Sequence, residues 1–115
     1  MVRNDISTAG RIAHPSAVTW VNGRQAVITE IDSEGRISSC GIERGYSTEQ
    51  TFLADIVHAI GDQERLMILG PTSARLALER AYVEVYHRPD CLVDVEPTGP
   101  ATPEELADRV RTLAG

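Results

Sequence analysis

The chain has 115 residues, a length that fits one domain around a single hydrophobic core. Its formal net charge is -6, and all of its basic residues are arginine. This acidic balance argues against a protein that holds nucleic acid with its whole surface, because phosphate binding depends on clustered cations. A local group of arginines remains compatible with the charge.

The first residues and the cysteines bear on where the protein acts. Residues 1–13 lack periodicity and predict a flexible leader before a single domain at 14–115. Cys40 and Cys91 lie far apart and outside any CxxC motif, which predicts reduced, buried thiols. No apolar run approaches the roughly 18 residues of a membrane span. We therefore expect a cytoplasmic protein without a membrane partner.

Three strands are predicted in the first half of the chain. Ala17–Val21 is rich in β-forming residues, and Asn22-Gly23 predicts a two-residue hairpin turn because both residues accept positive φ. Gln25–Asp32 alternates in polarity and returns as the second strand. Arg36–Ile42 is a weaker third strand, whose serines and glycine are typical of an exposed sheet edge.

Helical spacing begins near Tyr46 and alternates with two further strands. Ser47 or Thr48 is the expected cap of a helix that ends at Gly61. Arg65–Leu69 is a short apolar run, typical of a strand buried on both faces. The remaining elements are a helix capped by Thr72 or Ser73 and ended by Pro89, a strand at Cys91–Val95, and a helix with cap Thr102, Pro103 at its first position and a capping box completed by Glu105.

The second helix is expected to be amphipathic. Its outer face carries charged pairs four residues apart, and Arg75 is expected to face water in one of them. Its inner stripe is expected to consist of Ala74, Leu78, Ala81, Tyr82 and Val85.

The predicted order, β-β-β-α-β-α-β-α, is that of the ribonuclease H-like fold. This is an α/β architecture with a mixed five-stranded sheet in the order 3-2-1-4-5 and helices on both faces. Nucleases of this fold hold two metal ions with carboxylates from the first and fourth strands. Neither Ala17–Val21 nor Leu66–Leu69 offers a carboxylate, so this chemistry is excluded. We expect no metal, cofactor or catalytic set.

Two segments carry a family resemblance. Val18–Ala26 (VTWVNGRQA) and Leu66–Pro71 (LMILGP) resemble the middle domain of archaeo-eukaryotic peptide-chain release factors and Pelota. They look closest to small bacterial relatives known as translational-machinery or host-attachment proteins. The likeness covers about residues 17–114, and it implies a ribonuclease H-like fold with a ribosome or tRNA as partner.

The resemblance does not extend to the catalytic loop of release factors. In those proteins a Gly-Gly-Gln loop between the third strand and the first helix promotes ester hydrolysis at the peptidyl-transferase centre. The matching span here, Gly41–Ser47, lacks that tripeptide. The resemblance therefore implies a binding module rather than a peptidyl-tRNA hydrolase.

Two groups of side chains are candidate binding residues. The first group lies in or beside the predicted loops of the three-stranded half, where convergence would form a contact patch for RNA or another acidic partner. It consists of Arg24, Arg36, Arg44 and Tyr46. The second group lies where a central strand leads into a helix N-terminus, which can receive a phosphate or carboxylate, although a plain helix cap explains it too. It consists of Gly70, Thr72, Ser73 and Arg75.

Three hypotheses of function follow. The leading one is a non-catalytic binding module associated with the ribosome or tRNA. The second is a homodimer or larger homo-oligomer that extends its sheet through the third strand, Arg36–Ile42. The third is a binder of a small phosphorylated ligand, or an enzyme, at the Gly70–Arg75 corner. DNA is not expected as a partner.

Overall fold

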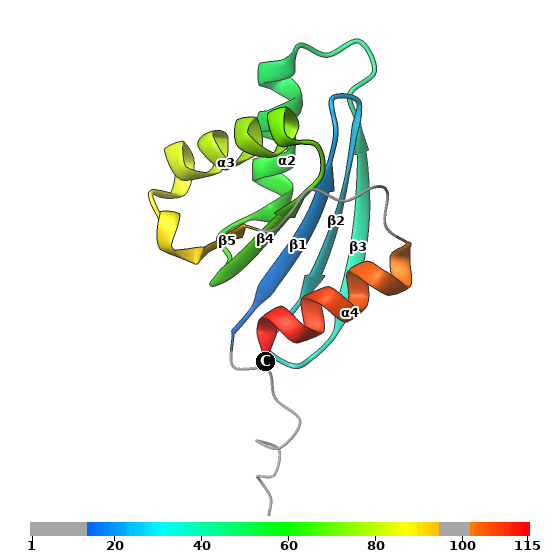
Figure 1. Cartoon of the computed structure of the whole chain (residues 1–115), viewed down its shortest axis with the longest axis vertical. Coiled ribbons are helices and arrows are strands. Elements are labelled where there is room, and N and C mark those ends of the chain that lie inside the picture. Colours follow the sequence, from blue (N-terminus) through cyan, green and yellow to red (C-terminus); the bar gives the residue numbers. More distant parts are fainter. Residues whose placement is uncertain (1–13, 95–101) are drawn as a thin grey trace, which may run out of the picture.

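The computed structural model describes residues 14–94 and 102–115, so the predicted leader at 1–13 lies outside it. A single five-stranded sheet has the order β3-β2-β1-β4-β5. Helices α2 and α3 lie on one face of this sheet and α4 on the other (Figure 1). The predicted strand order and the two-sided helix cover of the ribonuclease H-like fold are therefore confirmed.

The elements follow the chain in the predicted order. The strands are β1 (Ser16–Val21), β2 (Gln25–Ile31), β3 (Ile37–Glu43), β4 (Arg65–Leu69) and β5 (Leu92–Asp94). The helices are α2 (Glu49–Ile60), α3 (Thr72–Tyr86) and α4 (Pro103–Ala114), with a 3-10 turn η1 (Pro89–Cys91) before β5. Within the described residues, no helix is long and apolar enough to cross a membrane.

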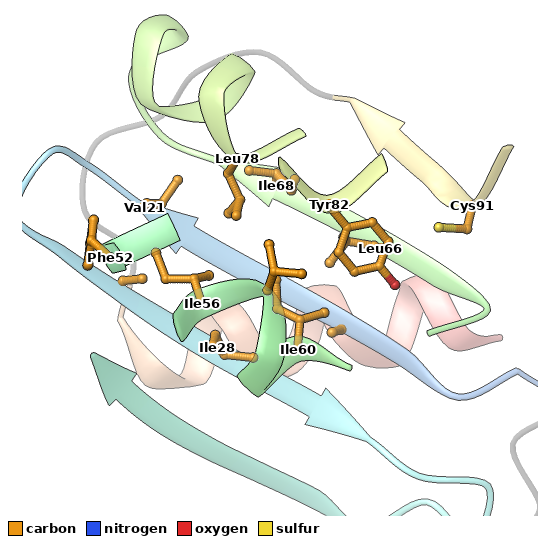
Figure 2. Packing of buried hydrophobic residues seen from close by; sticks show 13 residues of the cluster. Val21, Ile28, Phe52, Ile56, Ile60, Leu66, Ile68, Leu78, Tyr82 and Cys91 are labelled. Atoms are coloured by element: carbon orange, nitrogen blue, oxygen red, sulfur yellow. The ribbon is translucent and has the colours of Figure 1, made fainter. Parts of the chain in front are cut away.

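β1 is the central strand of the sheet, and both of its faces are covered. It pairs antiparallel with β2 and parallel with β4, so that Val18 lies between Thr29 and Met67. Towards α4, Val18 and Trp20 pack in a cluster with Leu106. The cluster under α2 and α3, drawn in Figure 2, is the larger of the two and includes Val21, Ile28, Phe52, Ile56, Ile60, Leu66, Ile68, Leu78 and Tyr82.

The β1–β2 hairpin forms as predicted, but its turn differs from the predicted one. Asn22 pairs with Gln25, and the two residues at the tip of the turn are Gly23 and Arg24. Neither Asn22 nor Gly23 has a positive φ. Instead, the Asn22 Oδ1 atom accepts hydrogen bonds from the N–H groups of Arg24 at 2.8 Å and Gln25 at 2.9 Å. This side-chain turn places Arg24 at the exposed tip.

The buried face of α3 also differs from prediction. Pro71, rather than Thr72 or Ser73, is the N-cap residue. Arg75 was expected to face water but is buried, with its Nη1 atom 3.9 Å from the Glu79 carboxylate. Val85 was expected inside but is 57% exposed. The last turn instead directs Tyr86 towards the core, where its ring centroid lies 4.9 Å from that of Tyr82.

The two thiols lie in different surroundings. Cys91 is buried, as predicted, and burial raises its thiol pKa. Cys40 is exposed, so the prediction of a buried thiol is wrong at this position. The reason is that Cys40 lies on β3, an edge strand of the sheet whose residues are mostly exposed.

Candidate functional site

Several loops meet at one end of the sheet. β1 and β4 are parallel and both end there, at Val21 and Leu69, and β3 ends there because it runs antiparallel to β2. The β1–β2 turn and the β3–α2 loop consequently lie next to each other, at the upper end of the molecule in Figure 1. Two of the predicted arginines, Arg24 and Arg44, lie in these segments.

Arg44 fastens the β3–α2 loop to the β1–β2 turn. Its backbone N–H donates to the Arg24 carbonyl at 2.8 Å. Its guanidinium donates from Nε to the Ser47 carbonyl at 2.9 Å and from Nη1 to the Gly23 carbonyl at 3.4 Å. These acceptors are all neutral carbonyl groups. They hold Arg44 in place without compensating the charge of its guanidinium group.

Arg24 and Tyr46 line the same groove as Arg44 and are open to solvent. The side chain of Arg24 is exposed at the turn, and Tyr46 is fully exposed in the loop, next to Gly45 with a φ of 55°. Within 14–94 and 102–115, neither Arg24 nor Arg44 has a carboxylate at ion-pair distance. We call Arg24, Arg44 and Tyr46 the hairpin–loop surface.

An open groove of about 640 Å³ runs along this surface. Its lining contains two polar residues that sequence reasoning did not single out, Gln25 and Ser47, together with Glu43. The pairing of Gln25 with Glu43 across β2 and β3 places these two residues in the groove. Knowledge of the strand register would have predicted their position, but neither Gln25 nor Glu43 stands out in the sequence by itself.

Arg36 does not join the other predicted arginines. It lies at the β2–β3 turn, at the opposite end of the ladder from Arg24 and Arg44. Its guanidinium contacts two carboxylates, those of Asp32 at 3.1 Å and Glu34 at 2.6 Å. Hydrogen bonds from the Arg36 backbone and side chain lower the pKa of the Asp32 carboxyl group. The charge of Arg36 is thus already balanced within its own turn.

The predicted anion-binding corner at Gly70, Thr72 and Ser73 lies beside Arg44. Gly70 has a φ of 131° and touches β1 so closely that a Cβ atom there would lie 2.0 Å from the Val21 carbonyl oxygen. The chain turns at this point into α3, with Thr72 and Ser73 exposed on its first turn. A small cavity of about 130 Å³ is lined by both Ser73 and Arg44, so the two groups adjoin. Arg75, by contrast, is buried towards Glu79.

Metal-binding side chains are not grouped at this end of the sheet. In the described part of the chain, no set of three or more His, Cys, Asp and Glu residues is placed to hold a metal ion.

Comparisons with known proteins place the fold. No protein-family model matches the sequence, and no curated protein matches it. Pelota from Archaeoglobus fulgidus superposes with a TM-score of 0.61 and 13% identity, over 93% of this chain and 33% of the Pelota chain. The fold is Pelota-like. Pelota from Thermoplasma acidophilum gives a TM-score of 0.57 at 20% identity, over 78% of this chain and 30% of its own.

The chain thus spans about a third of the length of these two Pelota proteins. At 13% and 20% identity the likeness establishes a shared fold. A shared fold does not determine function, which depends on the side chains of this chain's own hairpin–loop surface.

Proposed function

We propose that this chain is a non-catalytic binding module of the translation apparatus, which contacts the RNA of a ribosome or a tRNA in the cytoplasm. The Pelota-like fold and the release-factor resemblance support the link to translation. The β3–α2 loop occupies the position of the release-factor catalytic loop but carries Glu43, Arg44, Gly45, Tyr46 and Ser47 in place of the Gly-Gly-Gln tripeptide. We therefore assign it binding and no hydrolysis.

The observation that carries the proposal is the composition of the hairpin–loop surface. Two arginines without carboxylate partners among the described residues line one groove together with a fully exposed tyrosine. Arginine binds phosphate oxygens through charge-assisted hydrogen bonds, and an exposed aromatic ring can stack on an unpaired base. Together they fit a flexible single-stranded or looped RNA segment.

The net charge of -6 limits the strength of this binding. Arg36, Arg88 and Arg111 are each within 3.1 Å of a carboxylate and add little attraction. Two unbalanced arginines predict contacts to about two phosphates. The logarithm of the affinity should then fall with the logarithm of the salt concentration with a slope of about 1.4 to 1.8.

A binding assay with matched variants tests the proposal. Fluorescence anisotropy of labelled tRNA and co-sedimentation with ribosomes are measured at low salt. Tyr46→Ala should weaken binding about tenfold and Arg24→Ala about threefold, because each removes an exposed group without a folding role. Arg36→Ala is the control, since it removes the same charge at the opposite end of the hairpin.

Two results would contradict the proposal. One is the absence of binding to both tRNA and ribosomes at low salt by the folded wild-type protein. The other is an Arg36→Ala effect as large as that of Arg24→Ala, because non-specific attraction would then explain the binding.

The corner at Gly70 is proposed as a secondary part of the same surface. Ser73 adjoins Arg44 across the small cavity, Thr72 is exposed beside it, and the hydroxyl groups of both residues can donate hydrogen bonds to a phosphate. Arg75 is not assigned a contact, because it is buried beside Glu79. This favours an extended RNA contact over a separate pocket for a small phosphorylated ligand. A thermal-shift screen with nucleotides and sugar phosphates should accordingly show no stabilisation.

A further inference from the structure

In the part of the chain that the structure describes, the outer edge of β3 is unpaired along the whole strand. β3 has seven residues and forms one edge of the sheet, while the opposite edge strand, β5, has three. Proteins usually protect long edges with charged residues, prolines or bulges. The middle of β3 consists of Ser38, Ser39, Cys40 and Gly41, all exposed and none of these types. Among the described residues, no strand pairs with this edge.

The hydrogen bonds at the two ends of the β2–β3 ladder identify the free main-chain groups. The N–H of Arg44 donates to Arg24, and the N–H of Asp32 donates to Arg36. Bonded pairs alternate along an antiparallel ladder. The even-numbered residues of β3 therefore face β2. Residues Ile37, Ser39, Gly41 and Glu43 direct their N–H and C=O groups to the open edge.

This pattern is complementary to itself. When a second copy of β3 is laid antiparallel with Cys40 opposite the partner's Cys40, Ser39 faces the partner's Gly41. Ile37 likewise faces the partner's Glu43, so every outward-facing residue meets an outward-facing residue. All seven residues of the strand are paired in this register. Cys40 is at the centre, in a pair without direct hydrogen bonds.

The charges at the two ends of β3 also favour this arrangement. The β2–β3 turn is net negative, with Asp32 and Glu34 around Arg36. The other end is net positive, with Arg24 and Arg44 beside Glu43. An antiparallel pairing places the negative end of each copy next to the positive end of its partner, which adds favourable electrostatic complementarity.

From these observations we propose that the β3 edge is a self-association surface. A second copy of this chain adds its β3 antiparallel across a two-fold axis at Cys40, and one continuous sheet forms across both copies. The contact uses main-chain groups of β3 and does not rest on the proposed RNA binding.

The association is tested under reducing conditions by analytical ultracentrifugation over a wide range of protein concentration. The wild-type protein and Cys40→Ser should both form a dimer, since the thiol is not needed for pairing. Cys40→Lys should shift the dissociation constant upwards at least tenfold, because it sets two like charges opposite each other at the axis. A wild-type protein that stays monomeric, or a Cys40→Lys variant that dimerises as well as Cys40→Ser, would overturn the proposal.

The register is tested by oxidative cross-linking. Opposed residues in a pair without hydrogen bonds have Cα atoms about 4.5 Å apart, within the range of a disulfide. Mild oxidation should link the wild-type protein through Cys40, while Cys91 is buried and does not contribute. Ser39→Cys in a Cys40→Ser background is the control. It should link much more slowly, because Ser39 faces the partner's Gly41, and equal rates would show that the register is wrong.

Discussion

Gly70 shows how a single residue allows the turn between β4 and α3 to lie close to β1. Its φ of 131° is a conformation that other residues rarely adopt, and an added Cβ atom would lie 2.0 Å from the Val21 carbonyl oxygen. We predict that Gly70→Ala destabilises the protein by about 3 kcal/mol in denaturant unfolding. Gly23→Ala is the control, because no atom lies within 4 Å of a Cβ there. Equal stability of the two variants would refute the close contact.

Tyr82 links the end of α2 to α3 and makes the stability of the protein depend on pH in the alkaline range. Its hydroxyl donates to the Gly61 carbonyl at 2.9 Å and accepts from the Gln63 N–H at 3.1 Å. Burial raises the pKa of Tyr82 to about 12, above its ordinary value near 10. The unfolded chain therefore loses this proton first, so stability is retained below pH 10 and falls as the pH rises towards 12.

We predict a loss on the order of 2 kcal/mol in the free energy of unfolding over this range. The ionisation of Tyr82 can be followed by tyrosinate absorbance, which separates it from that of the Cys91 thiol, whose pKa burial also raises. Tyr82→Phe should be less stable at pH 8, because two buried backbone groups lose a partner, but should show a flatter pH dependence. A Tyr46→Phe variant should keep the wild-type slope. If Tyr82→Phe keeps it too, the assignment fails.

Among the elements, α4 has the most clearly encoded start. The Thr102 Oγ1 atom accepts from the Glu105 N–H at 3.1 Å, and the Glu105 carboxylate accepts from the Thr102 N–H at 2.8 Å. This is the capping box that the sequence predicts, and it lowers the pKa of the Glu105 carboxyl group. The helix it begins covers Trp20 with Leu106 and neighbouring side chains.

We predict that Thr102→Ala lowers the unfolding free energy by about 1 kcal/mol, because it leaves a backbone N–H of the first turn without its partner. Trp20 fluorescence measures the unfolding of this half of the core directly. Thr112→Ala serves as the control, since Thr112 is exposed and its hydroxyl bonds within the helix to the Asp108 carbonyl. A Thr102→Ala effect no larger than that of Thr112→Ala would mean that the cap contributes little.

The predictions succeeded where a local cause determines the element and failed where tertiary contacts decide. Thr48 caps α2 and Gly61 ends it, as their chemistry indicates. The face of α3 depends instead on how the helix packs. Arg75 can be buried because Glu79 lies four residues away, and Tyr86 replaces Val85 because it can pack near Tyr82. Hydrophobic spacing alone does not predict which of these side chains is buried.

For the whole molecule, the predicted element order, matched to the ribonuclease H-like fold, was sufficient to predict the strand order. The convergence of Arg24 with Arg44 follows from the antiparallel pairing of β2 and β3, which brings the start of one strand to the end of the other. The same pairing removes Arg36 to the far end. The candidate residues in these three loops could therefore be listed from the sequence. The strand register was needed to show which of them lie at the same end of the sheet.

The binding of RNA by the hairpin–loop surface is the proposal on which the assigned function depends. It is tested most directly by backbone amide NMR spectra of the labelled protein during titration with tRNA at low salt. We predict that the largest shifts fall on Gly23–Gln25 and Arg44–Thr48, with little change at Arg36, and that Tyr46→Ala requires about tenfold more tRNA to reach the same shifts. Unchanged spectra at high tRNA concentration, or shifts centred on the Arg36 turn, would contradict the claim.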